Sequence, residues 1–121
     1  MVELAADMKL IAEGLRFPEG PIALPDGSVL LVEIARGTLS RVTPDGAVSV
    51  VAECGGGPNG VAYGPDGRVY VCNNGGFEWR VKDGRYLPGH QPVDYAGGSI
   101  QAIDVDTGEV ETIYSECDGH M

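Results

Sequence analysis

Basic side chains are scarce in this sequence. Eight Lys and Arg residues stand against 18 Asp and Glu, which gives a formal net charge of −10 at pH 7. The basic residues are scattered singly, so no basic patch follows a nucleic-acid backbone or an anionic membrane surface. We therefore expect neither nucleic acid nor membrane as a partner.

Long hydrophobic runs and cysteine pairs are also missing. No apolar run approaches the roughly 20 residues that span a bilayer, and the N-terminal MVELAADMKLIAEG lacks the basic stretch of a secretion signal. Cys54, Cys72 and Cys117 are odd in number and form no Cys-x-x-Cys pair, which argues against a disulfide framework and against a zinc cage. We expect a soluble, cytoplasmic protein with reduced thiols.

A helical hydrophobic period is absent as well, whereas glycine is abundant. The 121 residues include 19 glycines, and 43% of the residues are apolar. Turn triplets such as Pro25-Asp26-Gly27 and Pro44-Asp45-Gly46 separate short alternating segments. This pattern predicts one all-β domain over residues 1–121 with a hydrophobic core.

The sequence repeats itself. FPEGPIALPDGSVLLVE (17–33) returns as GPNGVAYGPDGRVYVCN (57–73), about forty residues later. Each copy divides into four short strands. In the first copy these are 21–24, 28–33, 38–43 and 47–53; in the second they are 60–64, 68–73, 99–105 and 109–115. The wider spacing in the second copy predicts an insertion within residues 73–98.

Four-stranded repeats of about 40 residues are typical of β-propeller blades, which bury their faces against neighbouring blades. We predict a first blade at 19–54 and a second at 57–117, with the insertion as a long loop, and a closing strand at 8–13 that completes a further blade. A closed propeller takes about four to eight blades. The remaining blades are therefore expected in missing sequence or on another chain.

The first strand of a blade is the innermost, so residues just before it converge near the propeller axis. Glu19 and Asn59 hold the same place in the two copies. We therefore expect both to point toward one axial site. The competing interpretations are a solvated loop carboxylate for Glu19 and an Asn-Gly turn at Asn59.

Three strings carry a family resemblance: FPEGPIALPDG, GPNGVAYGPDGRVYVCNNGGFEW and YAGGSIQAIDVDTGEVETIYSECDG. They closely resemble the SMP-30/gluconolactonase/regucalcin-like family of six-bladed propeller lactonases, and the likeness runs from Leu10 onward over only the N-terminal portion of a typical member. The resemblance implies an axial divalent cation, most commonly Ca²⁺, with Zn²⁺, Mn²⁺, Mg²⁺ or Fe²⁺ as alternatives. It also implies a sugar lactone as substrate.

The resemblance gives roles to individual residues. Glu19 matches the family's metal-ligating Glu, and Asn59 matches a position that contacts substrate or metal-bound water in relatives. An Arg that some members carry two residues before this Asn is Gly57 here. Carboxylate and amide oxygens are the ligands that hard divalent ions prefer.

The insertion supplies further candidates on the same face. We predict that Asn73, Asn74 and Trp79 contact the substrate, because amides can bind hydroxyl groups and an indole can stack on a sugar ring. For Trp79 the alternative is an anchor that holds a long loop in place. Glu33, at the end of the second strand, either supports the site or is an edge-strand charge.

The resemblance therefore implies metal-dependent hydrolysis of a sugar lactone to its aldonic acid, with this chain as the N-terminal part of the enzyme. It assigns no general base within this segment. The alternative is a non-catalytic propeller fragment, or a binding or scaffold module assembled from several chains, because propellers host many functions.

Overall fold

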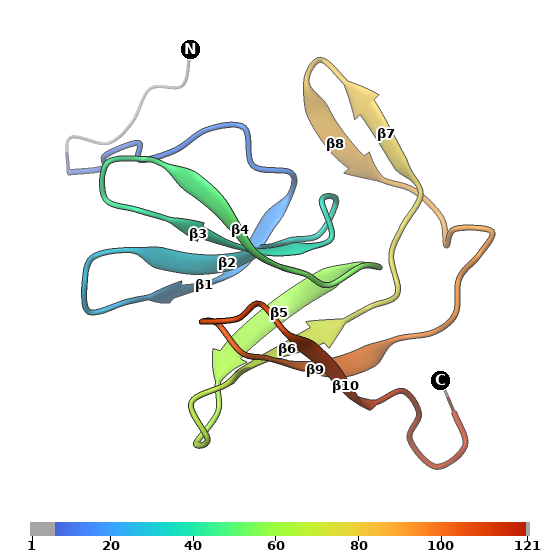
Figure 1. Cartoon of the computed structure of the whole chain (residues 1–121). Coiled ribbons are helices and arrows are strands. Elements are labelled where there is room, and N and C mark those ends of the chain that lie inside the picture. Colours follow the sequence, from blue (N-terminus) through green and yellow to red (C-terminus); the bar gives the residue numbers. More distant parts are fainter. Residues whose placement is uncertain (1–6, 121) are drawn as a thin grey trace.

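The computed structural model describes residues 7–120, and over this range the chain is entirely β. Two four-stranded antiparallel sheets and one two-stranded hairpin make up the fold (Figure 1). The strands of the first sheet are β1 (Pro18–Ala23), β2 (Val29–Glu33), β3 (Thr38–Val42) and β4 (Val48–Glu53). The second sheet contains β5 (Pro58–Tyr63), β6 (Val69–Asn73), β9 (Ser99–Ile103) and β10 (Val110–Tyr114). In the described part of the chain, no helix is long and apolar enough to cross a membrane.

Each sheet is a simple meander, with strand orders β1-β2-β3-β4 and β5-β6-β9-β10. All eight strands predicted from the repeat are present, with ends shifted by a few residues at most. The Pro-Asp-Gly turns form as expected. In the first turn Asp26 accepts a hydrogen bond from the Ser28 N–H at 2.9 Å, and Gly27 has φ 84°.

The two sheets pack against each other as neighbouring blades. Their shared core consists of Leu30, Val32, Leu39, Ala52, Val69, Val71 and Ile103. The inner strands β1 and β5 touch through their backbones, since a Cβ on Gly20 would lie 3.1 Å from Val61 N and 3.3 Å from Gly60 Cα. Gly20 also has φ 56°. Both the space and the conformation therefore require glycine at position 20.

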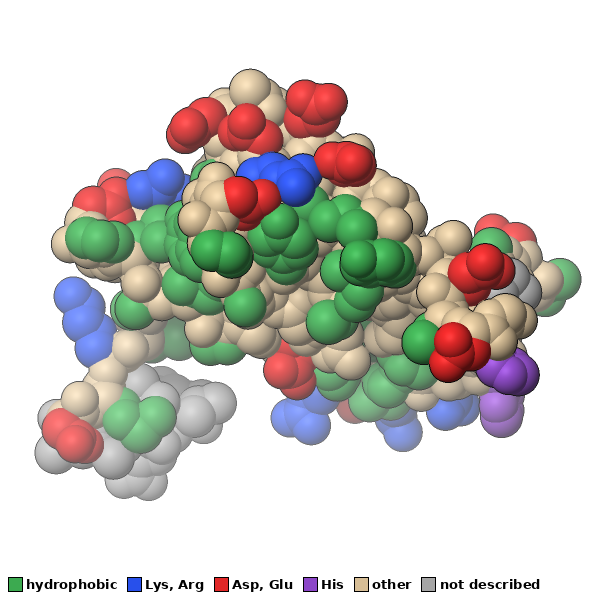
Figure 2. All heavy atoms as spheres, turned by 90° about the horizontal axis from the view of Figure 1, so that it is seen from below, with side chains coloured by type: hydrophobic (Ala, Val, Ile, Leu, Met, Phe, Trp, Pro, Cys, Tyr) green, Lys and Arg blue, Asp and Glu red, His purple; other side chains and the backbone are tan. Residues whose placement is uncertain are grey.

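Hydrophobic side chains also remain on the surface. Seen from below in Figure 2, they gather on one face, with acidic side chains beside them. The exposed large hydrophobic residues include Val48, Val50, Tyr63 and Tyr114. Such exposure is expected of blades that have a neighbour on only one side.

The connection between β6 and β9, which corresponds to the predicted insertion, contains a hairpin that was not predicted. Strands β7 (Trp79–Lys82) and β8 (Arg85–Pro88) pair around a two-residue turn, in which Asp83 and Gly84 have φ values of 52° and 73°. This hairpin extends away from the two blades (Figure 1). The Asp-Gly pair between two short alternating segments is a hairpin signal that the sequence did contain.

Residues 8–13, predicted as a closing strand, form no strand in this structure. Met8, Leu10 and Ile11 are exposed, and the segment passes the β3–β4 turn, where a Cβ on Gly46 would lie 2.5 Å from Ile11 O. A β-strand needs a hydrogen-bonding neighbour. Because the expected neighbour is a further blade, the closing strand stays a prediction.

Candidate functional site

Glu19 lies at the start of β1 between two residues with left-handed backbone. Phe17 has φ 58° and Gly20 has φ 56°, and a positive φ is strained for an aromatic residue. The Glu19 backbone pairs with Val32, while its side chain is exposed and takes part in none of the ion pairs among the described residues. Its carboxylate is therefore available to a ligand.

Asn59 occupies the matching place on β5. It follows the buried Pro58, its side chain is exposed, and the next residue is Gly60, which touches Gly20. Glu19 and Asn59 thus each precede one of two glycines whose backbones are in contact. The two residues therefore hold matching places on neighbouring inner strands, and their direction toward a propeller axis stays a prediction.

Glu33, at the end of β2, is completely buried at 0% exposure. Its carboxylate accepts hydrogen bonds from the Arg16 main-chain N–H at 2.8 Å, from Arg36 Nε at 2.9 Å and from Ser40 Oγ at 2.6 Å. Burial by itself raises the pKa of Glu33, but the bonds from Ser40, Arg16 and Arg36, together with the Arg36 charge, lower it below its ordinary value. Glu33 is therefore a buried, ionised side chain that links Arg16, Arg36 and Ser40. It is not an edge-strand charge, because β2 lies between β1 and β3.

Asn73, at the end of β6, is 8% exposed. Its Oδ1 accepts from the N–H groups of Gly57 and Gly75, both at 2.9 Å. Its Nδ2 donates to Gly55 O at 2.8 Å and to Gln101 Oε1 at 3.1 Å. These four bonds use the full capacity of a carboxamide. Direct contact with a substrate stays a prediction for Asn73, and the bonds seen here are all internal.

Asn74 fills the space beside Gly57. Its Oδ1 accepts from the Gly76 N–H at 2.8 Å, which fixes the orientation of the amide, and its buried Nδ2 has no partner among the described residues. A Cβ on residue 57 would overlap the Asn74 Oδ1 and lie 3.0 Å from Gly76 Cα. Glycine at position 57 is thus explained by the Asn74 side chain and the Gly76 main chain beside it.

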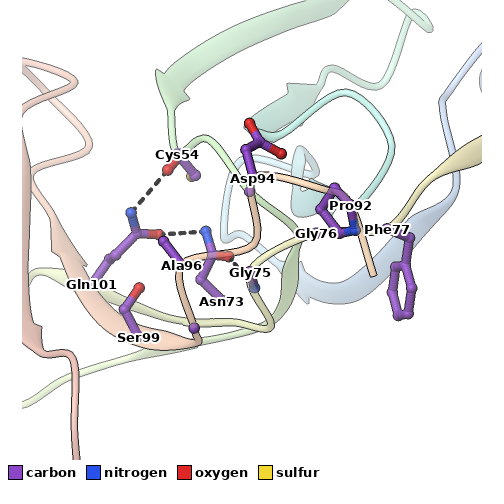
Figure 3. A pocket seen from close by; sticks show the side chains of 12 residues that line it. Cys54, Asn73, Gly75, Gly76, Phe77, Pro92, Asp94, Ala96, Ser99 and Gln101 are labelled. Atoms are coloured by element: carbon purple, nitrogen blue, oxygen red, sulfur yellow. Dashed lines mark hydrogen bonds between the residues drawn. The ribbon is translucent and has the colours of Figure 1, made fainter. Parts of the chain in front are cut away.

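A pocket of about 460 Å³ lies under the insertion, next to the Asn73 network (Figure 3). Gln101 donates to Cys54 O at 2.9 Å on one wall, and Asp94 lies across the pocket. Ser99 and Phe77 also line it. Carboxylate, amide and hydroxyl groups in one cavity suit a ligand rich in hydroxyl groups. Sequence reasoning missed Gln101, Ser99 and Asp94, although a Gln between the apolar residues Ile100 and Ala102 of one strand was a usable signal.

The Cys54 thiol lies beside this pocket, in surroundings that favour its neutral form. Burial, with a smaller contribution from the Glu53 charge, raises the pKa of Cys54 to about 11, against a weaker opposing hydrogen bond from Leu39. The thiol is therefore protonated at neutral pH.

Trp79 belongs to an aromatic cluster that ties the hairpin to the N-terminal segment. Its ring centroid lies 5.4 Å from that of Phe17, 5.8 Å from that of Phe77 and 6.4 Å from that of Tyr86. The guanidinium of Arg16 lies 5.7 Å from the centroid of the Tyr86 ring. Trp79 therefore has the contacts of an anchor for the loop. One of its partners, Phe17, lies two residues before Glu19 in the chain.

The donor set fits part of a hard-cation site. The Glu19 carboxylate and the Asn59 amide are oxygen donors of the type that Ca²⁺ prefers, and both are exposed. Within residues 7–120, however, no three His, Cys, Asp or Glu side chains are grouped as metal ligands. These residues alone therefore supply fewer ligands than the six to eight that Ca²⁺ usually takes.

Comparison with known proteins shows the family to which the sequence is similar. The sequence model of the SMP-30/Gluconolactonase/LRE-like region matches residues 17–121. A gluconolactonase of Zymomonas mobilis subsp. mobilis is 27% identical over 89 residues, which cover 62% of this chain and 25% of that protein. The chain thus corresponds to about a quarter of the length of this relative.

Proposed function

Because the chain belongs to the SMP-30/gluconolactonase/LRE-like family, we propose that it forms part of a lactonase that hydrolyses a sugar lactone to its aldonic acid. A divalent cation, in the first place Ca²⁺, is held in part by Glu19. The observation that carries this proposal is that Glu19 and Asn59 hold matching places on inner strands whose backbones touch, and that both residues are exposed.

In this proposal each residue has a separate task. Glu19 contributes a carboxylate to the cation, and the Asn59 amide orients the lactone. When bound, a divalent cation polarises a carbonyl group and lowers the pKa of water. Trp79 and Asn74 shape the insertion side of the site, and the polar pocket beside Asn73 accommodates hydroxyl groups of the sugar. The other blades of the propeller supply the remaining ligands and the general base.

The test is Glu19→Gln in the protein's native assembly, with Glu109→Gln as a matched control. Glu109 is an exposed carboxylate in the β9–β10 turn, so its replacement removes the same charge. We expect lactone hydrolysis by the Glu19 variant to fall about 100-fold and to lose its dependence on added Ca²⁺. Unchanged hydrolysis would remove Glu19 from the mechanism.

The same assay separates this proposal from a non-catalytic binding or scaffold module. Native mass spectrometry of the active fraction should detect further polypeptide with the missing blades, either in the same chain or beside it. Particles built only from this segment, together with no lactone hydrolysis under any divalent cation, would favour the binding module.

A further inference from the structure

The last residues of β2 and β6 are equivalent in the repeat. Each accepts a hydrogen bond from the main chain that leads into the inner strand of its blade. Glu33 and Asn73 stand about forty residues apart, at the same offset as Glu19 and Asn59. Both are buried polar side chains, with exposures of 0% and 8%. Buried polar groups at a repeated position are retained only where their hydrogen bonds are satisfied.

The backbone on either side repeats as well. The Ile34 N–H donates to Phe17 O at 3.0 Å, and the Asn74 N–H donates to Gly57 O at 2.8 Å. In each blade the residue after the buried polar side chain thus binds the residue that lies two positions before Glu19 or Asn59. The segment that leads into each inner strand is attached to the end of the second strand.

The side chains complete this attachment. Glu33 accepts from the Arg16 N–H at 2.8 Å, and Asn73 accepts from the Gly57 N–H at 2.9 Å. In the first blade Arg36 adds a link, because its Nη2 donates to Gly14 O at 3.3 Å while its Nε binds Glu33. The chain before each inner strand is therefore held by a side chain as well as by the backbone.

These bonds hold a strained turn in place. Phe17 has φ 58° directly after Arg16, and such a conformation persists in an aromatic residue only when its surroundings over-determine it. Glu19 follows two residues later, before Gly20 fixes the strand against β5. The direction in which the Glu19 side chain leaves the sheet therefore depends on the Arg16–Phe17 turn.

We infer that Glu33 is a positioning residue for Glu19, as Asn73 is for Asn59. Its carboxylate fixes the left-handed turn at Phe17 and so aims the Glu19 carboxylate at the cation. This inference rests on the proposed role of Glu19 as a ligand. It concerns metal affinity, which can be measured without any turnover.

The experiment measures Ca²⁺ binding by isothermal titration calorimetry in the native assembly. Glu19→Gln should abolish binding at the site. Glu33→Gln should raise the Kd about tenfold with unchanged stoichiometry, as expected when a residue that orients a ligand is lost. Glu109→Gln, the matched charge change, should stay within about twofold of the wild type, because screened surface charges act weakly at a distance.

A second substitution separates positioning from general stability. Asn adopts positive φ more readily than other non-glycine residues, so Phe17→Asn should reduce the need for Glu33. In the Phe17→Asn background, Glu33→Gln should raise the Kd less than about threefold, which is the coupling expected of residues in one network. If Glu33→Gln does not fold, Ser40→Ala, which removes the 2.6 Å bond to Glu33, should raise the Kd about two- to threefold.

The outcomes are distinct. If Glu19→Gln abolishes Ca²⁺ binding while Glu33→Gln behaves like Glu109→Gln, the positioning role is wrong and the proposed metal site stands. If Glu33→Gln weakens Ca²⁺ binding by the same factor with Phe and with Asn at position 17, Glu33 acts through stability or charge, and the inference is wrong. If Glu19→Gln leaves binding intact, the metal role and the inference fall together.

Discussion

The two blades carry different polar side chains at the same buried position, a carboxylate at Glu33 and an amide at Asn73. Glu33 only accepts hydrogen bonds, and an arginine lies beside it, whereas Asn73 both donates and accepts. The connections they serve explain the difference. Residues 34–37 of the first blade include Arg36, which supplies a cation, while Asn73 faces both N–H and C=O groups of the main chain. The hydrogen-bonding groups of the adjoining loops therefore account for a carboxylate in the first blade and an amide in the second.

The strongest way to test this comparison is to remove each side chain. Glu33→Ala should lower the free energy of unfolding by about 3 kcal/mol or more, because it removes the carboxylate that accepts from Arg36 Nε and from the Ser40 hydroxyl. Asn73→Ala should lower it by about 2 kcal/mol, because neutral main-chain groups lose their partners. Urea denaturation of both variants, with the exposed Glu53→Ala as control, measures the difference. Equal losses of unfolding free energy in the two variants would contradict the expectation that the charged Glu33 contributes more than the neutral Asn73.

Exchange of the amide for an acid sharpens the comparison. In Asn73→Asp, one carboxylate oxygen would face Gly55 O and Gln101 Oε1, which currently accept from Nδ2. The pKa of this introduced carboxyl should rise, because its neighbours favour the protonated form. We expect a loss of about 2 kcal/mol at pH 7 that shrinks as the pH falls through the raised pKa. A loss that is independent of pH would show that the amide donors are not required.

Glu33 should show the opposite dependence on pH. Its pKa is lowered in the folded chain from an ordinary value of 4.5, so its contribution is fully present above that value and is lost as the pH falls through the lower, folded pKa. The stability gap between wild type and Glu33→Gln should therefore be constant from pH 7 to about pH 5 and close below about pH 4. Unfolding curves measured over this range test the direction, and a gap that widens in acid would contradict it.

The smallest effect is expected at the hairpin that only the second blade has. Trp79→Ala removes three aromatic contacts, each worth about 0.5–1.5 kcal/mol. Because the hairpin can separate without opening the blades, we expect a global loss of about 1 kcal/mol. Amide hydrogen exchange should become faster in β7 and β8, and Val81→Ala, at a position that is 61% exposed, should change little. Unchanged exchange after Trp79→Ala would mean that the cluster does not dock the hairpin.

The repeat allowed much of this fold to be predicted. Turn triplets and alternating apolar residues located all eight blade strands, and the shared offset placed Glu19 and Asn59 on neighbouring strands. Both are properties of local spacing, which a sequence displays directly.

The buried polar network was harder to predict. Asn73 was expected at the substrate, and Glu33 was left between two interpretations, because spacing does not show whether a polar side chain at a strand end meets water or a folded loop. Gln101 and Ser99 join the pocket only through the long connection between β6 and β9. Contacts across such an insertion depend on tertiary packing, which no short motif encodes.

The Asn74 side chain occupies the space that a side chain at position 57 would need. This limits the order in which substitutions at positions 57 and 74 can occur. Gly57 is not among the positive-φ glycines, so its backbone conformation allows a side chain, but a Cβ there would lie 3.0 Å from Gly76 Cα even if the residue at 74 were smaller. A substitution at 57 that comes first meets both the Asn74 amide and the Gly76 main chain, whereas one that follows a reduction at position 74 meets only the Gly76 main chain. A lineage that gains a side chain at position 57 should therefore pass through a small residue at 74, and laboratory evolution of the site is expected to follow the same route.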